Sequence, residues 1–297
     1  GLDPGRDPYT FPNVQLCCER KPPRRDDCCD GYRPPQPPHP HFITVDCSGP
    51  TRRDVVGSVR EAVARIRNGG TIQVLPTVAC DISGLLIDRS VSIEAVSYQY
   101  GGRAVLSSNG ACATASTSPA SDGIRIRGFD VEGCIALNSG ELLIEETNIA
   151  WRGQGAAIEM RGGALAIVHS TVRARETALN ASNGQKVNIN TSRFATTPDG
   201  RNVIRLNVGR AQLADVLVKG ARVGLYVDNV NEGFDIERFD VVRSEGDDPY
   251  PAADQGDQGI VIGDGHVLHD IPWLSGMESR KAGIRSGKII GYRTGVA

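Results

Sequence analysis

Apolar residues alternate with polar ones in short segments that recur along most of the chain. One segment usually places two apolar residues two positions apart. It occurs first as Ile124-Arg125-Ile126 and, from Ile135 onward, recurs as Ile135-Ala136-Leu137, Ile158-Glu159-Met160, Leu179-Asn180-Ala181, Ile204-Arg205-Leu206, Leu225-Tyr226-Val227, Ile260-Val261-Ile262 and Ile284. A second segment places a polar residue before an apolar one, as in Asn148-Ile149, Thr171-Val172, Arg193-Phe194, Asp215-Val216, Asp240-Val241 and Asp270-Ile271. Successive starts lie mostly 21 to 25 residues apart, with one longer step of 35 in the first series and one of 30 in the second. Such alternation buries one face of a strand, so the chain is predicted to repeat one strand-containing unit about every 22 residues.

A repeat of this length without helices is typical of one coil of a β-solenoid. Glycine and Asn-Gly positions between the segments supply the turns. A leucine-rich repeat needs a Leu-x-x-Leu-x-Leu frame, which is absent, and a β-sandwich has no fixed period. We therefore predict an all-β fold, a parallel β-helix whose coils stack about 4.8 Å apart.

The two ends of this repeat differ in pattern. Near its start, Ile43-Thr44-Val45 predicts a strand, and apolar residues at helical spacing predict an amphipathic capping helix over about 55–67. Such a helix would cover the exposed first coil. At the other end, the strand-like Lys288-Ile289-Ile290 is followed by no cap. We therefore expect the β-helix domain, residues 42–297, to continue beyond 297 or to associate end to end with another chain.

The segment Gly69-Gly70-Thr71-Ile72-Gln73-Val74-Leu75-Pro76 after the helix, and the repeat Asp122-Gly123-Ile124-Arg125-Ile126, carry a family resemblance. Together with the leading strand, they resemble the right-handed parallel β-helix superfamily that includes pectate lyases, the pectin-lyase-like fold. The resemblance covers about residues 43–297. It implies right-handed coils and a link to polysaccharides, but this fold serves lyases, hydrolases, epimerases, adhesins and spacers alike.

Residues 1–41 have a different composition from the rest of the chain. Ten of the 17 prolines lie within the first 40 residues, which excludes regular helix or sheet there and predicts a linker or a stapled arm. All eight cysteines lie in the first half of the chain: Cys17, Cys18, Cys28, Cys29, Cys47, Cys80, Cys112 and Cys134. Adjacent cysteines suit separate disulfides better than a metal site or free thiols. Disulfides predict an oxidising location, the periplasm, surface or exterior of a bacterial cell.

Charge and hydropathy narrow the classes of partner. The formal net charge is −2, which provides no field to attract nucleic acid. No apolar run approaches the length of about 18 residues that a membrane span needs. With these partners set aside, the link to polysaccharides that the superfamily resemblance implies leads us to expect a polysaccharide or a protein of the cell envelope as the partner.

The longest step of the repeat contains an acidic segment. Residues 244–258 include Glu245 and four aspartates that offer the oxygen ligands calcium prefers: Asp247, Asp248, Asp254 and Asp257. This segment is interpreted either as a calcium site or as a solvated loop without an ion. Directly after it, Asp264, His266 and Asp270 form the densest titratable cluster, which is a candidate acid–base pair or a set of surface groups.

The superfamily resemblance also implies places to look for catalysis. Polygalacturonase-like members use the motifs Asn-Thr-Asp, Asp-Asp, Gly-His-Gly and Arg-x-Lys, in that order. Related segments occur in the chain in the same order, most of them with a changed residue: Asn190-Thr191-Ser192, Asp247-Asp248, Gly265-His266-Val267 and Arg280-Lys281. A lyase of this fold would need a basic residue to remove a proton from a uronate. The candidates are Arg173, Arg193, Arg205 and Arg222, and no pattern in the sequence selects one of them. We expect this chemistry to be absent or incomplete.

Two further sets of residues are candidates for binding a ligand. Asp215, Asp240 and Asp270 hold the polar position of the second repeat on three successive coils, so they predict either a cation-binding or sugar-binding stripe or a solvated face. Trp151, Tyr226 and Trp273 are candidate platforms for sugar stacking, on different coils. Because the catalytic pattern is incomplete, we expect an extracytoplasmic module for binding, attachment or spacing. A polysaccharide lyase, epimerase or glycoside hydrolase with its site near residues 245–270 is the competing expectation.

Overall fold

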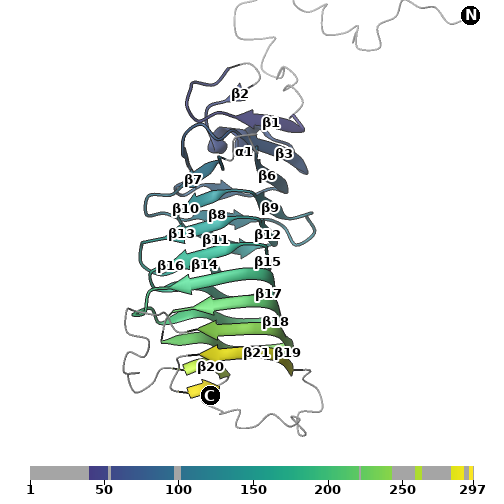
Figure 1. The fold of residues 1–297 in the computed structure, drawn as a ribbon. Coiled ribbons are helices and arrows are strands. Elements are labelled where there is room, and N and C mark those ends of the chain that lie inside the picture. Colours follow the sequence, from purple (N-terminus) through teal and green to yellow (C-terminus); the bar gives the residue numbers. More distant parts are fainter. Residues whose placement is uncertain are drawn as a thin grey trace, which may run out of the picture. The chain divides into compact units, whose positions relative to one another are not determined.

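The computed structural model describes residues 40–52, 55–96, 102–220, 222–242, 258–262, 282–290 and 294–296. The chain divides into two units, Gly1–Pro38 and His39–Ala297, and all of the described residues belong to the second. This second unit is a parallel β-solenoid, as the repeat predicts, and its coils stack in chain order (Figure 1).

Three ladders of parallel strands run along the stack. The first contains β2 (Val55–Val56), β1 (Phe42–Val45), β3 (Gly70–Val74), β6 (Val91–Ala95), β9 (Ile124–Arg127), β12 (Glu141–Glu145) and β15 (Ala164–Val168). The second contains β4 (Cys80–Asp81), β7 (Val105–Ser107), β10 (Asp130–Glu132), β13 (Asn148–Trp151) and β16 (Thr171–Ala174). The third contains β5 (Leu86–Ile87), β8 (Ala113–Ser116), β11 (Ile135–Ser139) and β14 (Ala156–Met160).

Farther along the chain, long strands take part in more than one ladder. Successive parts of β17 (Thr177–Thr196), β18 (Asn202–Lys219) and β19 (Val223–Val242) belong to the third, first and second ladders in turn. β21 (Ala282–Ile290) continues the first two ladders, while β20 (Gln258–Ile262) and β22 (Thr294–Val296) continue the third.

The third ladder confirms the first repeated segment from Ile135 to Ile260. The assignment of Ile124 and Ile284 to the same series is wrong, because Ile124 pairs with Val91 and Leu142, and Ile284 pairs with Ile236, all on the first ladder. Each apolar starter pairs with the next one in the series, from Ile135↔Ile158 to Leu225↔Ile260. These side chains are buried and form part of one continuous core. Strict spacing in the sequence therefore corresponds to strict register between coils.

The second repeated segment keeps its register only in part. Asn148, Thr171 and Arg193 are paired in succession, as predicted. The next partner of Arg193 is Leu217, and Leu217 pairs with Asp240. The predicted alignment of Asp215 with Asp240 is therefore wrong by two residues.

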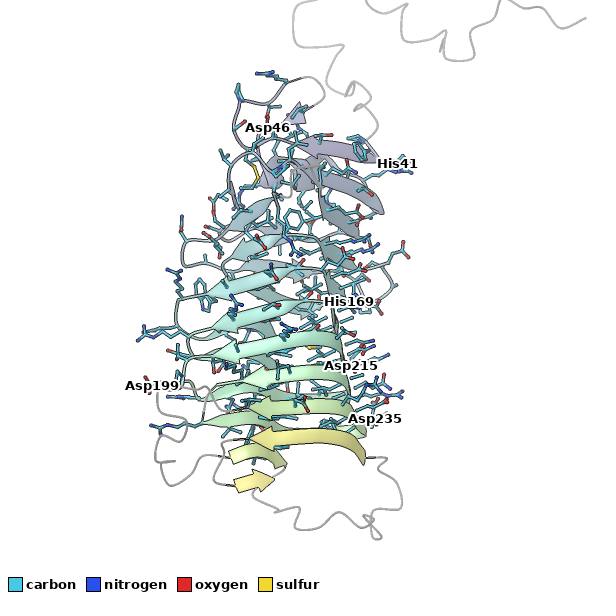
Figure 2. The ribbon with its side chains drawn as sticks, in the orientation of Figure 1. His41, Asp46, His169, Asp199, Asp215 and Asp235 are labelled. Carbon is cyan, nitrogen blue, oxygen red and sulfur yellow. A yellow bond between two sulfur atoms is a disulfide. The ribbon has the colours of Figure 1, made fainter. Side chains whose placement is uncertain are left out.

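The reason for this shift is the corner between the first and second ladders. One residue there has a positive φ on each coil, and these corner residues are Glu146, His169, Thr191, Asp215 and Arg238, with φ between 46° and 54°. Two of them, His169 and Asp215, are labelled at one edge of the coils in Figure 2, across from Asp199. Asp215 thus turns the chain instead of belonging to the strand face.

A ladder of buried hydroxyl groups follows directly after this corner. The amide of Thr147 donates to Ser170 Oγ at 3.2 Å, and the amide of Ser170 donates to Ser192 Oγ at 3.2 Å. Each hydroxyl in turn donates to the carbonyl two residues before it, at 2.7 to 2.8 Å. The buried Phe129 and Val216 occupy the same position in the sequences of the flanking coils. These three buried hydroxyl groups are therefore satisfied by hydrogen bonds inside the stack.

Two disulfides lie in the described part of the chain, Cys47–Cys80 and Cys112–Cys134. Cys112 and Cys134 precede the paired residues Ala113 and Ile135, so this bond joins two neighbouring coils. The prediction of disulfides is confirmed for these four cysteines. Cys17, Cys18, Cys28 and Cys29 lie outside the described residues, as does all of the proline-rich arm before residue 40.

The predicted helix is present as α1 (Val59–Arg65), between β2 and β3. Ser58 begins it, and its hydroxyl accepts a hydrogen bond from the Glu61 amide at 3.2 Å. Val59, Ala62 and Val63 are buried. The role of this helix as a cap stays a prediction. No helix in the described ranges is long and apolar enough to cross a membrane.

Candidate binding groove

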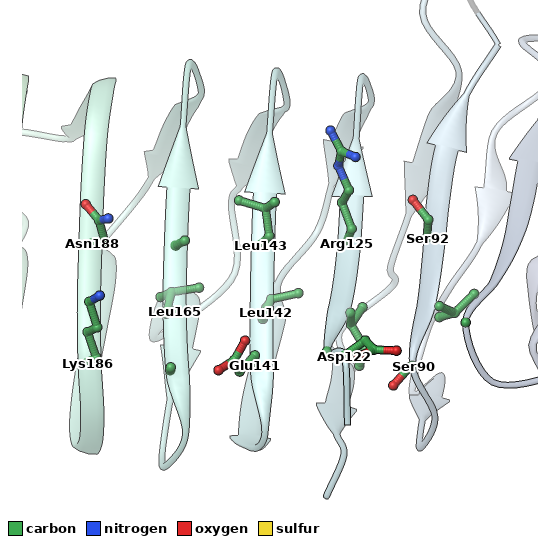
Figure 3. Close-up of a pocket in the computed structure, with 16 residues that line it drawn as sticks. Ser90, Ser92, Asp122, Arg125, Glu141, Leu142, Leu143, Leu165, Lys186 and Asn188 are labelled. Carbon is green, nitrogen blue, oxygen red and sulfur yellow. The ribbon is translucent and has the colours of Figure 1, made fainter. Parts of the chain in front are cut away.

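The outer face of the first ladder is hollowed into an open groove of about 530 Å³. The groove crosses β6, β9, β12, β15 and β17, so it runs along the stack from coil to coil (Figure 3). Its central line is a column of outward residues in strict register, with one residue from each of these strands: Ser92, Arg125, Leu143, Ala166 and Asn188. The groove is therefore a product of the parallel stacking, which brings residues far apart in the sequence side by side.

The floor of the groove is apolar because of which residues alternate outward. Leu143 and Ala166 are half-buried, and Ala164 lies beside them on the outward face. These short side chains lie between the longer Arg125 on one side and Lys186 on the other. The difference in side-chain length is what makes the hollow.

Charged and polar groups line one edge of the groove. Glu141, Ala164 and Lys186 are paired in succession, so a carboxylate and an ammonium flank a methyl group on consecutive coils. Asp122 lies at the same edge, before β9. In the described part of the chain, no ion pair or side-chain hydrogen bond holds Asp122, Glu141 or Lys186. These three groups are available to a ligand.

The turn at Gly123 brings this edge close to the next coil. Gly123 has a φ of +78°, and an added Cβ would lie 2.9 Å from the Cβ of Glu141. Only glycine fits this turn without moving Glu141. Gly123 thus allows the turn that carries Asp122 to pack closely against Glu141 on the next coil.

Unlike Asp122, Glu141 and Lys186, Arg125 is held by an ion pair within the chain. Its Nε lies 3.0 Å from Glu145 Oε2, and its Nη2 contacts the same oxygen. Next to it, Arg127 pairs with Glu146 at 3.1 Å and thereby lowers the pKa of the Glu146 carboxyl. Arg125 therefore presents a fixed guanidinium to the groove, and this rigidity reduces the entropic cost of binding a ligand.

The sequence-predicted sites near the end of the chain are not described by the structure. The calcium candidates Asp247, Asp248, Asp254 and Asp257 lie outside the described residues. So do the catalytic candidates Asp264, His266 and Asp270, and the aromatic candidate Trp273. Within the described ranges, no group of three or more His, Cys, Asp or Glu residues is arranged to hold a metal ion.

The two described members of the aspartate stripe lie at different positions. Asp215 is a corner residue, and Arg238 Nη2 donates to its Oδ2 at 2.8 Å. This hydrogen bond lowers the pKa of the Asp215 carboxyl below its ordinary value of 3.8. Asp240 is exposed on the second ladder, in the column of Arg193 and Leu217. The predicted stripe is therefore not a continuous row in the described coils, although the ligand-binding role of each residue stays a prediction.

The described aromatic candidates lie on other ladders than the groove. Trp151, on the second ladder, donates from its indole nitrogen to the Gln154 carbonyl at 3.0 Å and lines a separate hollow of about 300 Å³. Tyr226, on the third ladder, has the guanidinium of Arg205 over its ring, 5.7 Å from the centroid. One face of this ring is already occupied, so Tyr226 offers less area for stacking a sugar than the sequence predicts.

The altered polygalacturonase motif Asn190-Thr191-Ser192 does not form a catalytic surface in the fold. Thr191 is a corner residue, and Ser192 belongs to the buried hydroxyl ladder. The residue that replaces the expected carboxylate therefore faces the core and not a substrate. The other three segments that resemble polygalacturonase motifs lie outside the described residues.

Sequence reasoning missed the groove itself. Its signal is the run Gly163-Ala164-Leu165-Ala166, in which the outward positions carry methyl groups while neighbouring coils carry Arg or Lys. This contrast becomes visible only when the first-ladder strands are aligned with one another. No protein-family model, curated protein or solved structure matches the chain.

Proposed function

We propose that the chain is an extracytoplasmic binding module that holds an extended polysaccharide chain along the groove of the first ladder. The observation that carries this proposal is the direction of the groove, which crosses five successive strands. An elongated ligand that lies across the coils meets one outward residue per coil in each column. A compact small molecule would use only part of this surface.

The chemistry of the groove also suits a sugar chain. A sugar ring has apolar C–H faces and hydroxyl groups around its edge, so it needs an apolar surface with polar groups beside it. Leu143 and Ala166 supply such a surface, while Asn188 and Glu141 offer hydrogen-bonding groups next to it. Lys186 adds a positive charge that a carboxylated sugar could pair with.

Binding is favoured over turnover by the groups in the groove. Its two carboxylates, Asp122 and Glu141, lie on the same edge, whereas glycoside hydrolysis uses carboxylates on opposite sides of the scissile bond. Arg125 is paired with Glu145 and is not an available base. The competing proposal of a lyase, epimerase or hydrolase is motivated by the acidic segment and the histidine cluster in the sequence near residues 245–270.

The location and the family form part of the same proposal. We infer an extracytoplasmic location, supported by two disulfides that staple the first coils. We also infer membership of the right-handed, pectin-lyase-like superfamily, supported by the parallel coils and by the motifs that resemble it. In that setting, α1 would serve as the cap of the first coil.

Substitution of the groove floor tests the function. Ala166→Trp fills the floor, and we expect the affinity for an oligosaccharide that binds the wild type to fall at least about tenfold, because steric exclusion removes the apolar contact. Ala214→Trp is the matched control, since Ala214 is also half-buried and outward on the first ladder but does not line the groove. Isothermal titration calorimetry with oligogalacturonate and cello-oligosaccharides measures the effect.

Two results would contradict the proposal. One is an equal loss of affinity in both variants, which would mean that the groove is not the binding surface. The other is the appearance of unsaturated or shortened products, which would identify an enzyme. Absorbance of unsaturated uronate products and chromatography of the mixture detect these.

A further inference from the structure

Positive charge is concentrated in the middle coils of the solenoid. Residues 150–222 contain eleven Lys or Arg residues and only four Asp or Glu residues, although the whole chain has a net charge of −2. The remainder of the chain therefore carries a surplus of acidic groups. A balanced total charge hides a local field that is strongly positive.

Part of this surplus lies on the second ladder and in the bend after β16, in a set of four cations that we call the basic face: Arg173, Arg175, Arg193 and Lys219. Arg173, Ala195 and Lys219 are paired in succession, and Arg193 lies two residues before Ala195 on the same outward face. Arg175 lies in the bend directly after β16. All four side chains are exposed.

The basic face is not neutralised by its neighbours in the described part of the chain. No ion pair there joins any of its four cations to a carboxylate. Among nearby acids, Glu176 accepts a hydrogen bond from the Gly155 amide at 2.9 Å, and Asp199 lies in the exposed turn after β17. Four exposed, like charges on adjacent coils repel one another, and an anionic partner would relieve this repulsion.

The basic face has clear limits along the stack. The outward residues of the second ladder form two columns of paired residues: Arg193 belongs to one, and Arg173 and Lys219 belong to the other. Two coils before β16, β10 carries the acidic Asp130 in the column of Arg193 and the acidic Glu132 in the column of Arg173. On the other side, Leu217 is followed by Asp240 on β19. The cations therefore form a band about three strands deep that is bordered by acids, and not a diffuse basic surface.

We propose that the basic face binds a linear acidic polysaccharide through its carboxylates. Guanidinium groups pair with carboxylates through two parallel hydrogen bonds, and three of the four cations are arginines. Three successive strands about 4.8 Å apart each carry one cation, Arg173, Arg193 and Lys219, staggered between two columns, so a linear polyanion that crosses these strands can contact more than one of them at once. This site is on the second ladder, so it does not depend on the groove of the first.

Nucleic acid fits the same face less well. Single-stranded nucleic acids are held by aromatic side chains on which bases stack, and none of the four cations has an aromatic residue paired beside it in its column. The disulfides also favour an oxidising compartment, where a polysaccharide is the more available polyanion.

Charge reversal tests the basic face in the full chain. The variant Arg173→Glu with Arg193→Glu is compared with Arg67→Glu plus Arg161→Glu, which changes the net charge equally at two exposed positions off the second ladder. Both pairs are made in the Ala166→Trp background, so that failure of the groove and failure of the basic face are measured separately. The probe is immobilised polygalacturonate, with a neutral glucan and duplex DNA as further arms, and surface plasmon resonance is recorded over a salt series.

We expect the Arg173/Arg193 pair to bind polygalacturonate about tenfold more weakly at low salt, and the control pair to bind as the parent does. The difference should shrink as salt rises, and the neutral glucan should respond to neither pair. An equal loss in both pairs, or no loss in either, would overturn the proposal. DNA binding of equal strength and equal sensitivity to the Arg173/Arg193 pair would also overturn it. The milder Arg173→Gln with Arg193→Gln pair repeats the test if the Glu pair fails to fold.

Discussion

At the scale of single residues, two kinds of position maintain the corner between the first and second ladders. The corner residue itself adopts a left-handed backbone, and it is Glu146, His169, Thr191, Asp215 or Arg238 on successive coils. The residue after it faces the core, where it must be apolar or must have its hydroxyl satisfied. Thr147, Ser170 and Ser192 meet this requirement because each hydroxyl donates to the carbonyl two residues before it. The hydroxyls of Ser170 and Ser192 also accept from the amides of Thr147 and Ser170, respectively.

Removal of the central hydroxyl of this ladder should destabilise the fold. Ser170→Ala leaves the buried amide of Thr147 without its acceptor, at a cost of about 1–3 kcal/mol. Ser118→Ala is the control, because Ser118 lies in an exposed turn. Urea unfolding followed by circular dichroism measures both. Equal stability of the two variants would mean that the hydroxyl ladder contributes nothing.

The ion pair between the corner residues Asp215 and Arg238 predicts that the stability of the fold depends on pH. The Asp215 pKa is lowered because Arg238 donates to the carboxylate, so its stabilising contribution is present above the unfolded pKa and is lost as the pH falls through the folded pKa. We expect the thermal midpoint to decline below about pH 4, and to decline less in Asp215→Asn. Asp199→Asn should follow the wild type. Identical pH profiles for all three proteins would contradict this role of Asp215.

At the scale of elements, the register between strands explains which predictions succeeded. The third ladder was predictable because each coil puts a large aliphatic residue at the same place, from Ile135 to Ile260. In the second ladder the true equivalent of Arg193-Phe194 is Leu217-Val218, which lacks the polar residue of the pattern. Asp215-Val216 matches the pattern instead, because the apolar Val216 occupies the place that Ser192 holds one coil earlier. The groove was not predictable from one repeat, since it arises from side-chain lengths compared across several coils.

The Cys112–Cys134 disulfide joins neighbouring coils that are separated by 22 residues in the sequence. Replacement of both cysteines by serine should cost about 3 kcal/mol for a loop of this size. In a solenoid each coil contacts mainly its neighbours, so the loss should remain local. We expect faster amide exchange in β8 and β11 but not in β18, measured by hydrogen–deuterium exchange. A uniform rise in exchange along all coils would contradict this local effect.

At the scale of the whole molecule, the repeated coils place two different candidate binding surfaces on two different ladders. A half-apolar groove follows the first ladder, and a band of cations follows the second. The net charge of −2 indicates neither surface, because it sums the basic middle coils and the acidic remainder of the chain. Stacking of the coils concentrates a minority of residues into continuous columns, and this concentration is what the sequence pattern could not show.

The most direct test of the proposed function is hydrogen–deuterium exchange of the full chain with and without an oligosaccharide that it binds. We predict slower exchange in β6, β9, β12 and β15 and in residues 186–190 of β17, the strands that the groove crosses. The buried strands of the third ladder should exchange as in the free protein. Protection confined to the second or third ladder, or no protection at saturating ligand, would contradict binding along the groove.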